Sequence, residues 1–154
     1  MKDNFEACLK VTLQQEGGWS NNPHDPGGQT MKGVTQRTYN DYRNRHGLAF
    51  QSVKYIGDAE LQDLYRVGYW NPINGDNIAK GLDLMTFDTC VNSSSVEARR
   101  LYSQLPQGSP TTKIIAYGRL RLGFMHRLRT WRWFSKGWTA RVNRVQSAAL
   151  EMIR

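Results

Sequence analysis

Residues 16–35 are the part of the chain that most constrains its fold, because they join two carboxylates to a dense run of turn-forming residues. Five of the chain's fourteen glycines lie in these twenty residues, together with two prolines and two adjacent asparagines. This composition predicts a tight, irregular backbone that a large ligand can approach closely. Loops held between rigid elements often carry binding and catalytic groups, so this segment is the first candidate for a functional site.

A helix with one buried face is predicted directly before this segment. Residues of its apolar face recur at helical spacing, namely Phe5, Cys8, Leu9, Thr12 and Leu13. Asp3 suits the N-cap and Gly17 the C-terminal stop. Glu16 lies about 20° from Phe5 around the helix axis, on the same face. Burial and the negative end of the helix dipole both favour its protonated form, which suits a general acid. The alternative is a Glu16 that extends into solvent from a frayed helix end.

Asp25 and Thr30 follow Glu16 by nine and fourteen positions. The sequence Asp-Pro-Gly-Gly is itself good turn chemistry, so Asp25 has a structural alternative as a turn-capping residue. From the residues alone, the functional and turn-capping roles of Asp25 are equally well supported.

Three motifs in this segment resemble glycoside hydrolase family 108. They are Glu-Gly-Gly-Trp from Glu16, Pro-x-Asp-Pro-Gly-Gly-x-Thr from Pro23, and Lys-Gly-Val-Thr from Lys32. Further matches begin at Tyr65, Phe87 and Gly137, so the resemblance covers nearly the whole chain. The family comprises N-acetylmuramidases with a lysozyme-like fold, many of them phage endolysins that degrade bacterial peptidoglycan.

The resemblance implies roles for individual residues. It implies that Glu16 is the catalytic acid, and Asp25 and Thr30 resemble the acid and threonine that follow the catalytic glutamate in phage-type lysozymes. It also implies that residues 1–90 form the catalytic part. Residues 91–154 would form a C-terminal helical part, assigned in the family to peptidoglycan binding and packed with the first as one globular unit.

Helical patterns dominate the rest of the chain, while strand signals are weak. Residues 17–34 are expected to form a loop or short hairpin. Helices are expected from a Thr35 cap to Arg45, from an Asp58 cap to Asn71, over 82–91, from Ser94 or Ser95 to Leu105, from a Thr111 or Thr112 cap to about Arg129, and through Trp138 to Met152. The expected fold is mostly α and lysozyme-like, with a small loop or hairpin lobe at the active site.

The helix over 82–91 is apolar on two sides, which predicts a buried central helix. Asp88 lies within it. An isolated buried carboxylate is costly, so Asp88 needs polar or charged partners.

Three aromatic residues are candidates for the wall of a saccharide cleft, because the apolar faces of sugar rings stack on aromatic side chains. They are Trp19, Tyr69 and Trp70. Core packing is the alternative for Tyr69 and Trp70, and the helical pattern favours it for Tyr69.

Positive charge is concentrated at the C-terminal end of the chain. The net charge is +8, but residues 1–112 hold 11 Lys/Arg against 12 Asp/Glu, whereas residues 113–154 hold 10 against 1. Contact with an anionic envelope is therefore expected through Arg127, Arg129 and Arg132. The alternative function is a basic helical nucleic-acid- or envelope-binding module without catalysis, although we expect no stable nucleic-acid partner.

The first residues lack the apolar run of a signal peptide, and no apolar stretch is long enough to span a membrane. We therefore expect a monomer made in the host cytoplasm that acts on the cell wall after release. Cys8 and Cys90 are expected to be buried, reduced thiols. The three histidines show no ligand spacing, so no metal or cofactor is expected.

Overall fold

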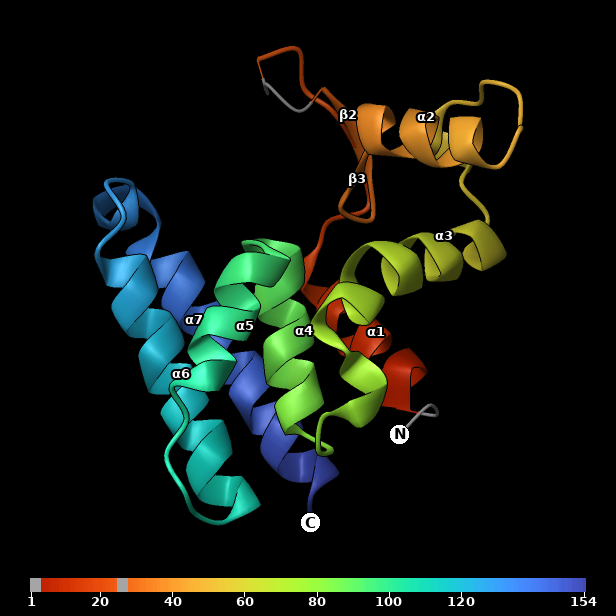
Figure 1. The fold of residues 1–154 in the computed structure, drawn as a ribbon. Helices are drawn as coiled ribbons and strands as arrows, with labels where there is room; N and C mark the ends of the chain where they lie inside the picture. The colour runs from red at the N-terminus through yellow and green to blue at the C-terminus, as the bar shows by residue number, and fades with distance from the viewer. Residues whose placement is uncertain (1–3, 25–27) are drawn as a thin grey trace.

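The computed structural model describes residues 4–24 and 28–154, and Figure 1 shows a helical body with a smaller lobe above it. The body contains α1 (Asn4–Gln15), α4 (Leu82–Asn92), α5 (Ser95–Ser103), α6 (Pro110–His126) and α7 (Trp131–Met152). The lobe contains β1 (Trp19–Asn21), β2 (Gln29–Met31), β3 (Val34–Thr35) and α2 (Gln36–Arg45). Helix α3 (Asp58–Tyr65) leads from the lobe back to the body. The mostly helical fold predicted from the sequence is confirmed.

Helix α4 lies at the centre of the body and contacts α1, α5, α6 and α7. Nine of its eleven residues are buried, which confirms the predicted central helix. Phe87 of α4 meets Phe5 and Trp70 edge to face, with ring centroids 5.9 and 5.5 Å away. This geometry suits the aromatic quadrupole and fixes α1 and the chain after α3 against α4.

The segment after α1 forms a small antiparallel sheet in the order β1-β2-β3. Trp19 of β1 pairs with Met31 of β2, and Thr30 of β2 pairs with both Ser20 and Thr35. Of the two expectations for this segment, a loop or a short hairpin, the hairpin is correct. A short third strand extends it and leads directly into α2.

The observed helix boundaries agree with the predicted ones where a local capping residue sets them. The Thr35 hydroxyl accepts from the Thr38 N–H, and α2 ends at Arg45 as predicted. The Ser94 hydroxyl likewise caps α5. The boundary predicted at Asp58 is displaced by one residue, because Gly57 is the N-cap and Asp58 lies in the first turn. The cap predicted at Asp3 lies outside the described residues.

Helix α6 begins earlier than its predicted cap at Thr111 or Thr112. Ser109 is the N-cap and accepts from the Thr112 N–H, while Pro110 is the first helical residue. Proline is well tolerated there, since its missing N–H would have no partner within the helix. The helix also ends at His126, and α7 follows after a short turn.

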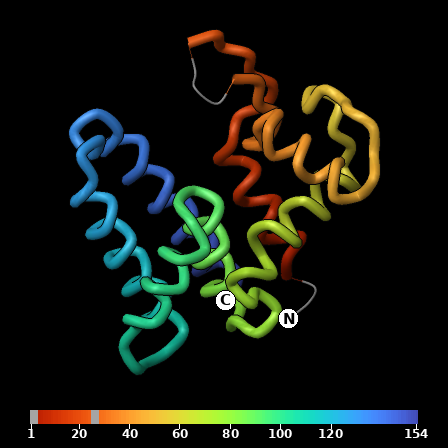
Figure 2. Tube along the Cα trace, turned by 45° about the horizontal axis from the view of Figure 1, so that its top comes forward, coloured from red at the N-terminus to blue at the C-terminus, as the bar shows by residue number. Residues whose placement is uncertain are grey.

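Helices α6 and α7 form an antiparallel pair on the other side of α4 from α2 and α3 (Figure 1, Figure 2). We call residues 127–136, which include the turn between the two helices, the hairpin tip. In Figure 1 the tip rises at the left edge of the molecule, beyond the end of α5. Within the described residues, no helix combines the length and apolar character that crossing a bilayer requires.

Cys8 and Cys90 are buried and free, as predicted. Burial raises the pKa of the Cys90 thiol to about 11 and also raises the pKa of Cys8. Both side chains therefore stay protonated and act as small apolar groups of the core.

Candidate active site

Glu16 lies immediately after α1, where the chain turns toward the sheet. Its backbone N–H donates to the Leu13 carbonyl oxygen, and its side chain remains 21% exposed. The carboxyl is thus neither free in solvent nor sealed in the core. It lies where the body meets the lobe. A group that acts on a bound ligand needs such a partly exposed position.

Gly33 makes room for the Glu16 side chain. Its φ of +82° is one that other residues rarely adopt. A Cβ on Gly33 would lie 2.7 Å from the Tyr65 hydroxyl and 3.0 Å from Cγ of Glu16. The Tyr65 hydroxyl in turn donates to the Lys32 carbonyl oxygen at 2.8 Å. The glycine therefore lets the turn between β2 and β3 close over the catalytic candidate.

Arg141 of α7 holds the Glu16 carboxyl. Its Nη1 lies 3.0 Å from Oε1 of Glu16. The same guanidinium donates twice to Asp88, from Nε and Nη2, each at 3.1 Å. Because one planar group bridges both acids, the position of Glu16 is tied to the centre of the helical body.

Asp88 is the buried centre of this arrangement, which we call the buried charge cluster (Glu16, Asp88, Arg121 and Arg141). Arg121 Nη1 lies 2.8 Å from Asp88 Oδ2, and the Thr12 hydroxyl donates to Oδ1 at 2.9 Å. Burial alone would raise the pKa of Asp88, but the two arginines outweigh it and lower the pKa below its usual value. The predicted need of Asp88 for partners is therefore confirmed.

Arg141 is not among the site residues predicted from the sequence. Arg141 lies one turn after Trp138 and directly before buried Val142, on the face of α7 that packs into the body. The sequence does contain a signal for Arg141. It is a basic residue on an apolar helix face, in a chain that also has an aspartate in a buried helix. Only the packing of α7 against α4 and α1 shows which acids it contacts.

The lobe carries two of the predicted site residues. Trp19 of β1 is 38% exposed, and the Lys54 ammonium lies 5.4 Å from its ring centroid. Thr30 lies at the middle of the sheet and is half-buried. Asp25, the second predicted carboxylate, lies outside the described residues.

Trp70 and Tyr69 both pack against the core, but only Tyr69 also lines a pocket. Trp70 is completely buried, so it has no ring face to offer a sugar, and the cleft-wall role predicted for it is wrong. It packs against Phe5, with centroids 5.4 Å apart, and its indole N–H donates to Asp76. Tyr69 is partly buried and packs against the core, as the helical pattern favoured, and it also lines a pocket.

A wide helical turn contains these two residues. Residues Arg66–Trp70 form a π-helix, η2, in which the Asn71 N–H bonds to the Arg66 carbonyl five residues back. The longer hydrogen bond puts an extra residue into the turn, so α-helical spacing no longer predicts where the residues that follow Tyr65 lie. Trp70 is completely buried there, while Tyr69 stays partly exposed.

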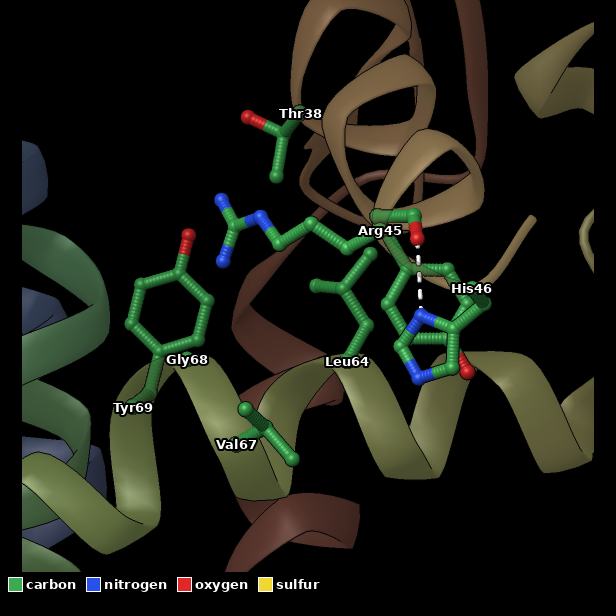
Figure 3. A pocket seen from close by; sticks show the side chains of 8 residues that line it. Thr38, Arg45, His46, Leu64, Val67, Gly68 and Tyr69 are labelled. Atoms are coloured by element: carbon green, nitrogen blue, oxygen red, sulfur yellow. Dashed lines mark hydrogen bonds between the residues drawn. The ribbon is translucent and has the colours of Figure 1, made fainter. Parts of the chain in front are cut away.

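The pocket beside Tyr69 has a volume of about 290 Å³ and lies between α2 and the α3–η2 segment (Figure 3). The Tyr65 and Tyr69 rings are 5.2 Å apart, which links the pocket to the turn over Glu16. Burial raises the pKa of the Tyr69 hydroxyl, and Cys90 and the Glu16 charge raise it further. Among the described residues, no group of His, Cys, Asp and Glu side chains has the arrangement of a metal site.

The family model of glycosyl hydrolase 108 matches residues 9–94, which is more than half of the chain and includes Glu16, Tyr69 and Asp88. The chain belongs to this family. A solved structure, that of SagA from Brucella abortus, is similar over the whole chain, with a TM-score of 0.81 and 29% identity, and the match covers 98% of SagA. No match was found among curated proteins.

Membership of family 108 makes the protein a glycoside hydrolase and supports activity on peptidoglycan. It also confirms the resemblance on which the lysozyme-like fold was predicted. The family match ends at residue 94, whereas Arg141, the partner of Glu16, lies beyond it on α7. The candidate site of this family 108 enzyme is thus completed by a residue outside the matched segment.

Proposed function

We propose that this glycoside hydrolase is an N-acetylmuramidase that cleaves the β-1,4 bond between N-acetylmuramic acid and N-acetylglucosamine, with Glu16 as the general acid. The observation that carries the proposal is the placement of Glu16. Its carboxyl is partly exposed and is fixed by Arg141 at 3.0 Å. The turn over it contacts Tyr65, whose ring lies 5.2 Å from that of Tyr69 in the pocket. Fixed geometry is what proton transfer to a glycosidic oxygen requires.

Arg141 contributes to the acid step through charge. When Glu16 gives its proton to the leaving oxygen, the carboxylate that remains carries a negative charge beside the guanidinium. This interaction is stronger after proton transfer than before it, so it lowers the energy of the transition state relative to the bound substrate. Asp88 and Arg121 keep the guanidinium in place while the charge on Glu16 changes.

Asp25 and Thr30 complete the proposed catalytic set. Asp25 stabilises the oxocarbenium-like transition state or positions water, with the Thr30 hydroxyl as its partner. The variants Asp25→Ala and Thr30→Ala separate this role from turn capping. Catalysis predicts a lost rate at an unchanged melting temperature, whereas turn capping predicts a lower melting temperature with the rate per folded molecule preserved.

Outside the catalytic centre, we propose two further contacts with the substrate and its surroundings. Trp19 is exposed in the lobe and stacks on a sugar ring. The hairpin tip contacts the anionic envelope through Arg127, Arg129 and Arg132, all of which are exposed. The protein acts as an endolysin on the wall after release from the cytoplasm. A binding module without catalysis is less well supported, because the family is one of glycoside hydrolases.

Product analysis on purified peptidoglycan tests the proposal. New reducing ends on N-acetylmuramic acid mark a muramidase, and reducing N-acetylglucosamine would assign the cut to the other bond. Anhydro-sugar ends would show transglycosylation. The anomer first released gives the stereochemistry, since carboxyls about 6.5–9.5 Å apart invert and those about 5–5.5 Å apart retain. An absence of soluble products would overturn the proposed function.

A further inference from the structure

The pocket beside Tyr69 has the size of a single-sugar site. Its volume of about 290 Å³ is at the lower end of the range for small-molecule pockets, roughly 300–1,000 Å³. The residues that line it are Thr38, Tyr42, Arg45, His46, Leu64, Val67, Gly68 and Tyr69. Leu64 and Val67 supply apolar surface, and Gly68 has no side chain to keep a ring away. A pocket of this kind accepts the apolar face of one sugar unit together with a substituent.

Arg45 supplies a positive charge to this pocket. It is the last residue of α2, and Figure 3 shows its side chain extending along the pocket from α2 toward the Tyr69 hydroxyl, below Thr38. Within residues 4–24 and 28–154, no hydrogen bond or ion pair occupies its guanidinium. The group is therefore free to bind a ligand.

Three other basic residues of the lobe have acidic partners. Arg43 lies 2.7 Å from Glu60, and Lys32 lies 3.8 Å from Asp58. The His46 ring, which also lines the pocket, lies 3.5 Å from Asp63. Arg45 thus differs from these three in presenting an unpaired, exposed guanidinium to a largely apolar cavity, where it can donate two parallel hydrogen bonds to an anion.

We propose that Arg45 binds a carboxylate of the peptidoglycan strand whose sugar occupies this pocket. The inference rests on the proposed function, and it adds a specificity that the catalytic residues do not supply. Peptidoglycan can present carboxylates of two origins: those of the stem peptide, and the lactyl carboxyl of N-acetylmuramic acid, which is free only where no stem peptide is attached to it. A neutral glycan such as chitin has neither. A guanidinium can bind either carboxylate through two parallel hydrogen bonds.

Three substrates identify the carboxylate. The first is intact peptidoglycan, and the second is the same glycan freed of peptides by an amidase, which leaves free lactyl groups. The third is that peptide-free glycan with its lactyl carboxyls converted to neutral amides. The protein variants are Arg45→Gln, Arg45→Lys and, as a matched control, Arg37→Gln, because Arg37 is exposed on the same helix but does not line the pocket.

We expect Arg45→Gln to lower kcat/KM about tenfold on acid-bearing glycan, since hydrogen bonds to charged groups are among the stronger ones. Arg45→Lys should keep part of the activity, and Arg37→Gln all of it. On the amidated glycan, Arg45→Gln should equal the parent. A loss on the peptide-free glycan alone assigns the free lactyl carboxyl, and a loss on intact peptidoglycan alone assigns the stem peptide. A loss on both shows that Arg45 binds whichever carboxylate the strand presents.

Binding provides a second measurement that does not depend on turnover. Dissociation constants for soluble fragments of the three glycans, measured with Glu16→Gln protein with and without Arg45→Gln, should show the same selective loss. Equal losses on neutral and acid-bearing glycan, or no loss on any of them, would overturn the role of Arg45. A parent protein that cleaves peptidoglycan while Arg45→Gln matches it everywhere refutes only this inference. A parent that releases no products refutes the proposed function and the inference with it.

Discussion

The arginines of α6 and α7 serve two different purposes in two regions of the same helical pair. Arg121 and Arg141 lie in the buried charge cluster. Both contact Asp88, and Arg141 also contacts Glu16. Arg127, Arg129 and Arg132 lie exposed on the hairpin tip. The tip is also apolar, since Trp133 is 64% and Phe134 53% exposed, and the Arg132 guanidinium lies 4.1 Å from the Trp133 ring centroid.

The difference shows that net charge counted along the sequence does not reveal what a charge does. After residue 112 the chain has ten basic residues and one acidic residue. Two of the ten are arginines that neutralise acids from earlier in the chain. Buried charges need partners at close range, because removing one of them leaves an uncompensated ion. Exposed charges are screened by salt and contribute little to folding. We therefore expect large effects on rate or stability at the cluster and small, salt-dependent effects at the tip.

Glu16→Gln should give the largest effect on rate. The amide has nearly the shape of the acid but has no proton to donate, and general acid catalysis typically contributes about 10²–10⁴-fold. Release of reducing ends should fall by that factor, while circular dichroism and the melting temperature stay close to those of the parent. A folded variant with more than a tenth of the parent rate would show that Glu16 is not the acid.

Arg121→Met should give the largest effect on stability. Arg121 is fully buried beside Asp88, and its loss leaves that carboxylate with one guanidinium instead of two. Breaking a buried pair typically costs about 3–5 kcal/mol in the free energy of unfolding. Chemical denaturation measures the change. Arg119→Met, on the exposed side of the same helix, is the matched control and should stay within about 0.5 kcal/mol of the parent. Equal effects of the two variants would contradict the distinction between buried and exposed arginines.

Stability should fall in acid because of Asp88. The two arginines lower its pKa in the folded protein below the value of about 3.9 expected for the unfolded chain. The stabilisation is therefore complete above about pH 4 and is lost as the pH falls toward the lower folded-state pKa. Unfolding free energies of the parent and Asp88→Asn, measured from pH 7 to pH 3, should converge as the pH falls. A constant difference over that range would exclude Asp88 as the group responsible.

Neutralising the hairpin tip should give the smallest effect. The triple variant Arg127→Gln, Arg129→Gln, Arg132→Gln should weaken binding to insoluble peptidoglycan by a few-fold. Each cation near an anionic surface contributes about 1 kcal/mol before screening, and the Debye length is only about 8 Å at 0.15 M salt. Pull-down across a salt titration measures the change. Turnover of a short soluble oligosaccharide and the melting temperature should stay the same. Equal binding with equal salt dependence would leave the tip without a role in wall contact.

Local chemistry determined much of what the sequence predicted correctly. A Thr35 hydroxyl placed three residues before the Thr38 N–H caps α2, and the Gly-Gly pair after Glu16 ends α1, because each depends on neighbours in the chain. The buried α4 followed from its own two-sided pattern, and the motif around Glu16 identified the family. Such features survive in many tertiary contexts, so they can be inferred without one.

Only the tertiary structure decided which residues meet across the chain. Glu16 and Arg141 are far apart in sequence, and their pairing depends on how α7 packs against α1 and α4. The complete burial of Trp70 occurs within a π-turn, a rare local geometry, where Trp70 packs against Phe5 and Phe87. The sequence by itself therefore determined the helices and the candidate acid. Packing decided the partner of that acid and which aromatic ring faces the pocket, because those choices minimise the energy of the whole core and not of any one segment.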